Sequence, residues 1–183
     1  MIDAAAIEPS TFVPCEFRVK WAATDWERRR AMALRRAVFC IEQGIFPGDD
    51  RDDIDDHAQL LVALSCIGGD FDEVVGTVRI HEAQPGCWWG SRLAVHAAYR
   101  HHGRIGATLI RLAVGSAHAR GCNVFLAHVQ SQNVPLFERL HWQSLGAEAL
   151  HGRPHERMQA DLAHYPPCES PYAGYVTRVG AAG

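Results

Sequence analysis

The spacing of hydrophobic and polar residues along the chain predicts an alternation of strands and helices. Between residues 16 and 21, hydrophobic Phe17, Val19 and Trp21 alternate with polar residues, which is typical of a half-buried strand. Five further segments favour strands: 60–66, 74–80, 90–95, 124–129 and 155–162. Three segments favour helices: 25–42, 105–120 and 134–140. The resulting order, β-α-β-β-β-α-β-α-β, predicts a mixed α/β fold.

Capping and turn residues mark the ends of these segments. Thr24 or Asp25 is suited to cap the first helix, which we expect to end near Gly44. Gly121 is suited to end the second helix, and Pro135 suits the first turn of the third. The second and third strand segments, separated by a short glycine-containing turn, predict an antiparallel hairpin.

A length of 183 residues favours one domain with a core large enough to need no disulfide bonds. We expect a flexible arm over residues 1–15, the folded domain over 16–165 and a tail over 166–183. The six cysteines include no C-x-x-C pair, so we expect free thiols and a location in the reducing cytoplasm.

Composition and charge disfavour several classes of protein. The chain is 48% hydrophobic and 21% charged, which is typical of globular proteins. A net charge of −3 disfavours a nucleic-acid partner, because such proteins usually carry basic surfaces. No apolar run approaches the ~20 residues that a membrane span requires, and the N-terminus lacks the basic start of a secretory signal. We therefore expect neither a nucleic-acid nor a membrane partner.

The acidic segment 49–56, with the sequence DDRDDIDD, holds six aspartates in eight positions. It lacks the glycine and the terminal glutamate of a calcium-binding loop. Like charges in such proximity repel one another, so we expect an exposed acidic loop. The alternative is a negatively charged lip that attracts a cationic amine substrate.

Eleven histidines raise the question of a metal site. His151 and His155 are four residues apart, with Cys168 downstream. Gly152 and Pro154 lie between the two histidines and disfavour the helix that would align their rings. We therefore expect no metal.

The segment 92–121 carries the strongest chemical signal. A short strand leads through a basic loop into a helix that begins near Gly103. A helix start presents unpaired N–H groups, and Gly103 and Gly106 let a phosphate approach the backbone, while Arg100 and Arg104 add positive charge. The segment is neither a Walker loop nor a dinucleotide fingerprint. It predicts a diphosphate site, with a glycine-containing helix start and no ligand as the alternative.

The same segment resembles the GNAT superfamily of N-acetyltransferases, in which a strand of type R-L-A-V precedes [QR]-x-x-G-x-[GA] and a helix. Arg92–Val95, Tyr99–Arg100 and Gly103–Gly106 carry the resemblance, which extends over about residues 16–165. The second glycine comes one residue late here, at Gly106. The resemblance implies the GNAT fold, a mixed and mostly antiparallel central sheet flanked by helices, with acetyl-CoA as cosubstrate.

A second match lies in residues 133–142, NVPLFERLHW, which resemble the GNAT segment that begins with an asparagine. Asn133 is thereby expected to contact the pantetheine arm. Phe137 falls where many members have a tyrosine that protonates the departing thiolate, and a phenyl ring has no such proton. Taken together, the motifs imply that the following residues contact acetyl-CoA: Leu93, Ala94, Val95, Arg100, His101, His102, Gly103, Arg104, Ile105, Gly106, Ala107, Asn133 and Phe137.

A third match is residues 34–43, LRRAVFCIEQ, with DDIDD and AQLLVA downstream. This pattern resembles the opening of ElaA-type GNATs, and acyl-homoserine-lactone synthases share a looser form of it. Together with residues 133–142, it also resembles a bacterial subgroup that gene neighbourhood links to nitrogen starvation.

The resemblance implies direct attack of an amine on the thioester, with the Val95 N–H contacting the carbonyl oxygen. A base must take a proton from the acceptor ammonium. Glu42 is the first candidate, and His81 and Glu82 are the second candidates. For each, the alternative is a solvated polar side chain without a catalytic role.

Two further features concern the acceptor. Arg79 is suited to bind an acceptor carboxylate, or else to pair with the acidic segment. Cys87 and Trp88–Trp89 are expected in a loop that covers the acceptor.

The leading hypothesis is an acetyl-CoA-dependent N-acetyltransferase that acts on a primary amine of a small molecule, as a monomer or a homodimer. One alternative keeps the fold and uses a longer acyl chain. The other is an acyl-CoA-binding sensor without turnover, which Phe137 and the altered glycine spacing leave open.

Overall fold

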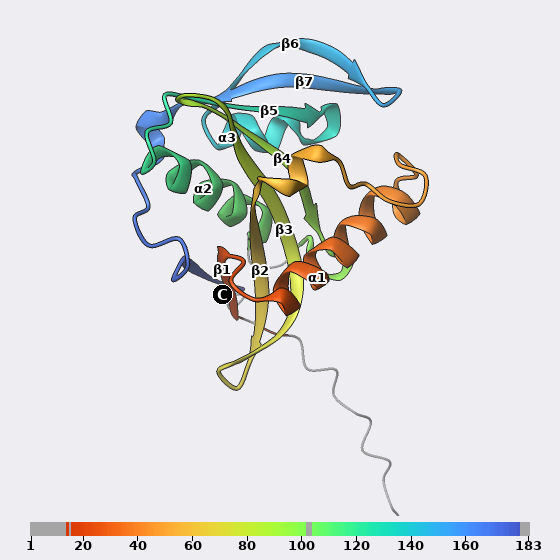
Figure 1. Ribbon diagram of the computed structural model, residues 1–183, viewed down its shortest axis with the longest axis vertical. Coiled ribbons are helices and arrows are strands. Elements are labelled where there is room, and N and C mark those ends of the chain that lie inside the picture. The colour runs from red at the N-terminus through yellow and green to blue at the C-terminus, as the bar shows by residue number, and fades with distance from the viewer. Residues whose placement is uncertain (1–13, 15, 102–103, 180–183) are drawn as a thin grey trace, which may run out of the picture.

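A computed structural model describes residues 14, 16–101 and 104–179. Its strands form one eight-stranded sheet in the order β6-β7-β5-β4-β3-β2-β1-β8 (Figure 1). The elements along the chain are β1 (Glu16–Trp21), α1 (Asp25–Arg35), β2 (Gln59–Ile67), β3 (Asp70–Gln84), β4 (Cys87–Val95), α2 (Ile105–His118), β5 (Val124–Gln130), α3 (Val134–Arg139), β6 (Trp142–Leu150), β7 (Arg153–Ala160) and β8 (Tyr175–Arg178).

The pairing of the strands confirms the expected mixed, mostly antiparallel sheet. β4 and β5 pair in parallel, and every other pair given by the strand register is antiparallel. Parallel neighbours need a long crossover connection, which α2 supplies between β4 and β5.

Alternating side chains of the central strands build a core on each face of the sheet. In β2, Leu61 packs into the cluster that contains Leu109 of α2, whereas Val62 packs with Ala31 and Leu34 of α1. The helices α1 and α2 therefore cover opposite faces (Figure 1). Among the described residues, none of the helices combines the length and the hydrophobicity that a membrane crossing demands.

The first helix begins as expected and then widens. Thr24 caps α1, and Glu27 completes a capping box by accepting a hydrogen bond from the Thr24 N–H. After Arg35 the chain continues as a π-helix over Arg36–Glu42. The predicted helix over 25–42 is confirmed in extent, with this change of winding in its last seven residues.

Three segments differ from the sequence-based expectation. β6 exposes most of its residues on both faces, so no apolar alternation marked it. Cys87–Trp89 lie within β4 rather than in a loop, because Trp88 and Trp89 pair with both neighbouring strands. β8 lies in the segment expected as a tail and pairs with β1. The bounds 16–165 for the domain stay a prediction.

The expectation of an exposed acidic loop is wrong for Asp50 and Asp55, whereas Asp49, Asp52, Asp53 and Asp56 are exposed as expected. Asp50 is only 1% exposed and accepts from Arg35 at 2.8 Å and from Arg92 at 3.0 Å. Arg79 pairs with Asp52 at 2.5 Å, which is the second of the two roles considered for this arginine. Three arginines therefore neutralise Asp50, Asp52 and Asp55, which leaves Asp49, Asp53 and Asp56 as the exposed acidic side chains of the segment outside these ion pairs.

Three other arginine contacts complete this cluster, and one of them pairs Asp52 with Arg92 at 3.1 Å. Asp55 pairs with Arg35 at 2.6 Å and with Arg79 at 2.9 Å. Hydrogen bonds from Arg35 lower the pKa of Asp55, although burial alone would raise it. We call Arg35, Arg79, Arg92, Asp50, Asp52 and Asp55 the arginine–aspartate cluster.

Candidate active site

The sheet splits between β4 and β5. The two strands pair only from Cys87 opposite Val124 to Gly90 opposite Ala127. Immediately beyond, Arg92 has φ +55°, and the register of β4 against β3 shifts. A bulge of this kind bends a strand, so β4 diverges from β5 after Gly90.

The arginine–aspartate cluster holds this bulge. The Arg92 guanidinium donates to Asp50 and Asp52 and lies 4.4 Å from the ring of Phe46. Arg79 donates a hydrogen bond to Ser91 Oγ at 2.8 Å and thereby holds the residue that directly precedes Arg92. A non-glycine residue at positive φ needs such external support.

A groove of about 690 Å³ runs from the split to the N-terminus of α2. It brings together ten of the residues expected to contact acetyl-CoA: Leu93, Ala94, Val95, Arg100, Arg104, Ile105, Gly106, Ala107, Asn133 and Phe137. His101 is exposed and does not line the groove. His102 and Gly103 lie outside the described residues.

The N-terminus of α2 opens onto this groove. Arg104 occupies the N-cap with φ +53° and supplies no side-chain cap, so the first N–H groups of the helix are available to a ligand. A Cβ added at Gly106 would meet only Val95 Cγ2, at 3.9 Å. The protein itself therefore does not require a glycine there, and the space over Gly106 belongs to the groove.

Positive charge lines the groove. Arg104, Arg111 and Arg139 have no ion-pair partner among residues 14, 16–101 and 104–179. Arg100 instead forms a bidentate pair with Glu42, at 2.6 and 2.7 Å, and donates from Nε to the Val95 carbonyl. The groove thus offers three uncompensated guanidinium groups to an anion.

The predicted catalytic residues lie in different places. Val95 lines the groove at the end of β4. Glu42 is bound by Arg100, whose hydrogen bonds lower the pKa of this carboxyl group and make it a weaker base. Glu82 accepts from the Gly86 N–H, and His81 packs against His57; neither residue lines the groove or the cavity beside it. The roles of all four stay predictions.

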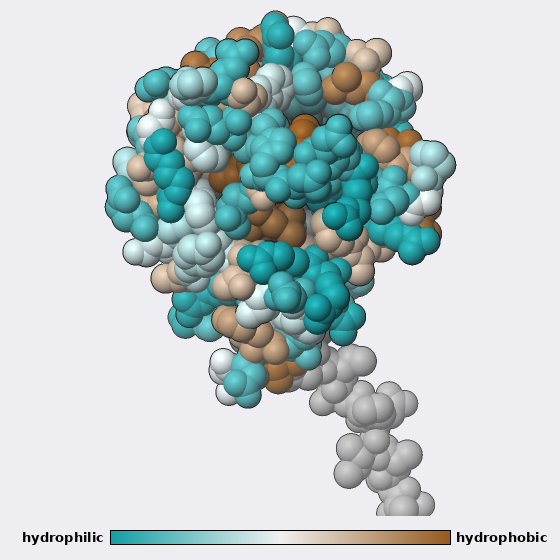
Figure 2. All heavy atoms as spheres, viewed as in Figure 1, coloured by the Kyte–Doolittle hydropathy of each residue, from teal (hydrophilic) through white to brown (hydrophobic). Residues whose placement is uncertain are grey.

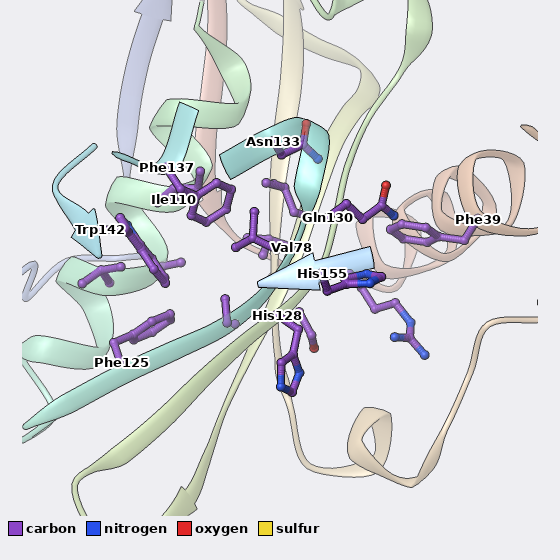
Figure 3. Close-up of a pocket in the computed structure, with 18 of the residues that line it drawn as sticks. Phe39, Val78, Ile110, Phe125, His128, Gln130, Asn133, Phe137, Trp142 and His155 are labelled. Atoms are coloured by element: carbon purple, nitrogen blue, oxygen red, sulfur yellow. The ribbon is translucent and has the colours of Figure 1, made fainter. Parts of the chain in front are cut away.

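A second cavity, of about 130 Å³, passes through the split and shares Leu93, Asn133 and Phe137 with the groove. Its α2 side is apolar and includes Val78, Ile110, Val114, Phe125, Phe137 and Trp142. Its opposite side includes Phe39, Phe46, Ser91, Arg92, His128 and His155. Figure 3 shows Phe125, Phe137 and Trp142 gathered away from Phe39 and His155. Figure 2 shows a hollow with hydrophobic residues below a hydrophilic rim.

A histidine–carboxylate pair, which the sequence analysis missed, lies on the polar side of this cavity. His128 Nε2 is 3.0 Å from Glu148 Oε2. Burial lowers the pKa of His128, and Glu148 offsets part of this effect. In the sequence, the only local sign of this pair was that His128 lies on the polar face of a predicted strand. Its partner Glu148 is 20 residues away in β6, which the sequence analysis did not predict. No group of three or more metal-ligating side chains occurs among the described residues.

Solved structures share this fold. A protein of Lactobacillus plantarum described as an N-acetyltransferase is 24% identical, with a TM-score of 0.69, and the match covers 79% of this chain and 97% of that one. Escherichia coli ElaA is 18% identical, with a TM-score of 0.65 and coverage of 80% and 99%. The CoA-dependent acyl-homoserine lactone synthase BjaI, solved with SAM and isopentyl-CoA, is 16% identical, with a TM-score of 0.64 and coverage of 79% and 83%.

Sequence comparison settles the family. A search of curated proteins finds no match. The family model of the acetyltransferase (GNAT) family matches residues 20–142, about two thirds of the chain and all elements from the end of β1 to the start of β6. With the split sheet and the open helix N-terminus, this match leads to one conclusion: the chain belongs to the acetyltransferase (GNAT) family.

Proposed function

We propose that the protein transfers an acetyl group from acetyl-CoA to a primary amine of a small molecule by direct attack on the thioester. The observation that carries the proposal is the groove itself. It joins the N-terminus of α2, which has no side-chain cap, and three arginines without an ion-pair partner in the described part of the chain to the split between β4 and β5. Helix N-termini and guanidinium groups bind phosphates, so the groove suits a diphosphate-containing cosubstrate.

In this proposal, the N–H groups of Ile105, Gly106 and Ala107 bind the diphosphate of acetyl-CoA. Asn133 contacts the pantetheine arm, and the thioester lies beside Val95, where backbone donors stabilise the oxyanion. Phe137 has no proton to give. The departing thiolate, with a thiol pKa of about 8.5 in model compounds, takes its proton from the attacking nitrogen or from water.

The acceptor amine enters from the face that carries α1. No aspartate or glutamate lines the second cavity among the described residues, and the charge of Arg92 is balanced within the arginine–aspartate cluster. A cavity of 130 Å³ is close to the roughly 150 Å³ that accommodates benzene in another protein. We therefore propose an acceptor with a compact apolar body and one amine rather than a polyamine.

The test is an assay for thiol release from acetyl-CoA. Benzylamine and phenethylamine represent the proposed class, and the larger tryptamine, spermidine and glycine serve as counterexamples. We expect turnover above solvent hydrolysis with the first two amines. Binding of acetyl-CoA without turnover of any amine would favour a sensor, and absence of binding would overturn the assignment.

A second candidate is transfer of a longer acyl chain. Phe137 lines both the apolar α2 side of the second cavity and the end of the groove where we propose that the thioester binds. An acyl chain on the thioester could therefore extend into this cavity. Its volume suits an acyl group of about five or six heavy atoms, by comparison with the benzene-sized cavity, and not a long fatty chain. A series of acyl-CoAs from two to eight carbons distinguishes the candidates by the chain length with the highest kcat/KM.

Membership of the nitrogen-starvation subgroup remains a prediction from the sequence motifs, as does homodimer formation. We propose a cytoplasmic location, where acetyl-CoA is available to the groove.

A further inference from the structure

His128 lies where the sheet opens. It directly follows Ala127, the last residue of β5 that pairs with β4. Phe125, Ala127 and Val129 point into the core beneath α2, so the alternating position of His128 places its ring on the opposite face. This is the face from which the proposed acceptor enters, and His128 lines the cavity there (Figure 3).

Contacts from β4 and from β6, which lies beyond β7 in the sheet, fix the orientation of the ring. Glu148 of β6 faces His128 Nε2 at 3.0 Å, and the ring of Trp89 in β4 lies 4.8 Å away, centroid to centroid. Arg157 Nε is 3.8 Å from the other oxygen of Glu148. Since a carboxylate only accepts, the Nε2 of His128 carries the hydrogen and its Nδ1 keeps a lone pair. In the described part of the chain, the His128 ring contacts Glu148 through Nε2 and packs against Trp89, and no hydrogen bond engages its Nδ1.

The other titratable side chains are less suited to accept a proton. Glu42 is occupied by Arg100. His155 is 7% exposed and donates from Nδ1 to the Arg153 carbonyl. Glu148 is its cross-strand partner, but the described ion pairs of Glu148 are with His128 and Arg157. His151 packs against Phe46. His128 thus combines a position in the cavity, a free ring nitrogen and a carboxylate that stabilises its protonated form.

We propose that His128, oriented by Glu148, is the general base that removes the proton from the acceptor ammonium. This inference rests on the proposed function. One N–H bond of the ammonium breaks, and Nδ1 of His128 takes that proton. The neutral amine then forms the C–N bond, the C–S bond breaks, and the second nitrogen proton passes to the sulfur of CoA. His128 returns its proton to water, so one proton is released in each turnover.

The charges around His128 set the expected pH dependence. Burial lowers its pKa from the ordinary value, Arg157 and His155 act in the same direction, and Glu148 opposes them. Arg92 and His151 also line the cavity. The neutral, proton-accepting form therefore predominates at pH 7, and turnover should fall as the pH drops through the lowered pKa.

The experiment compares His128→Gln, Glu148→Gln and His155→Gln, with His164→Gln as a control because His164 stacks on His141 and lines neither cavity. Calorimetry gives the Kd of acetyl-CoA, and thiol release with the best amine of the panel gives kcat across pH 5 to 9. His128→Gln should lower kcat by about 10²- to 10⁴-fold and abolish the acidic limb of the profile, with Kd unchanged. Glu148→Gln should lower kcat less and move that limb to lower pH.

The outcomes separate the two proposals. A wild-type protein that turns over amines, with a His128→Gln variant that keeps the rate and the acidic limb, overturns the base assignment alone. If His155→Gln loses the acidic limb of the pH profile and His128→Gln keeps it, the general base is His155, and the assignment to His128 is overturned. If the wild type turns over no amine, the proposed function and the base assignment fall together.

Discussion

Replacing Asp50 by asparagine tests how the arginine–aspartate cluster shapes the site. The Asp50 side chain is 0% exposed, and its Oδ2 accepts from both Arg35 and Arg92. Its Oδ1 is buried and accepts no hydrogen bond from any residue that the structure describes. An asparagine oxygen can occupy the Oδ2 position, so the substitution removes the charge and keeps the shape. Asp52→Asn is the matched control, because the Asp52 side chain is 37% exposed.

The magnitudes follow from burial. Removing one partner of a buried ion pair costs about 3–5 kcal/mol, and Asp55 still compensates Arg35, so we take the lower end, ~3 kcal/mol. The more exposed Asp52 should contribute about 1 kcal/mol. At roughly 2–4 °C per kcal/mol for a chain of this size, Asp50→Asn should lower Tm by about 6–12 °C and Asp52→Asn by about 2–4 °C.

Activity provides the second measurement. Asp50→Asn weakens the ion pair with Arg92, which stabilises the bulge at the point where β4 separates from β5. We therefore expect kcat/KM at 15 °C, where both variants are folded, to fall at least tenfold for Asp50→Asn and little for Asp52→Asn. Calorimetric melting and thiol release supply the data. A Tm within 2 °C of the wild type refutes the assigned energetics, whereas a lower Tm with full activity refutes the link between the cluster and the site.

Three further predictions concern the groove, the cavity and acid stability. Gly106→Val should weaken acetyl-CoA binding by about 10- to 100-fold, which is the equivalent of one charge-assisted hydrogen bond. Gly106→Ala should weaken binding less and raise the stability of the fold by up to ~1 kcal/mol through helix propensity. Equal affinity of both variants for acetyl-CoA in calorimetry would contradict the proposal that the diphosphate binds over Gly106. Ile110→Phe should fill the apolar side of the second cavity and reduce kcat/KM for six-carbon acyl-CoA relative to acetyl-CoA, and an unchanged ratio counts against an acyl pocket. Hydrogen bonds from Arg79 lower the pKa of Asp52, so this carboxylate stabilises the fold above its unfolded pKa of about 3.9, and that contribution is lost as the pH falls through the folded pKa. Urea midpoints should therefore fall below about pH 4 more steeply in the wild type than in Asp52→Asn, and parallel curves would exclude the assignment.

Local patterns were sufficient for the elements that bury one face. The sequence of β1 alternates between polar and hydrophobic residues, and α2 has a continuous apolar stripe, so the positions of both elements followed from the sequence. β6 was missed because most of its residues are exposed, and no periodicity distinguishes such a strand from a loop.

The charged groups of the site depend on long-range contacts. Asp50 pairs with Arg35 and Arg92, which are 15 and 42 residues away, so the acidic run looked solvated when considered alone. The groove was predicted from the resemblance of residues 92–107 and 133–137 to known motifs. His128 was not, because its role depends on a partner in β6 and on the exact residue at which β4 and β5 separate.

The most direct test of the central claim is a calorimetric titration of the full chain with acetyl-CoA, compared with adenosine. We predict saturable heat with one acetyl-CoA per chain and no heat with adenosine. The affinity for acetyl-CoA should weaken as salt is raised, because arginines and helix N–H groups hold the phosphates. Absence of heat with acetyl-CoA, or equal binding of adenosine, would contradict a diphosphate site at the start of α2.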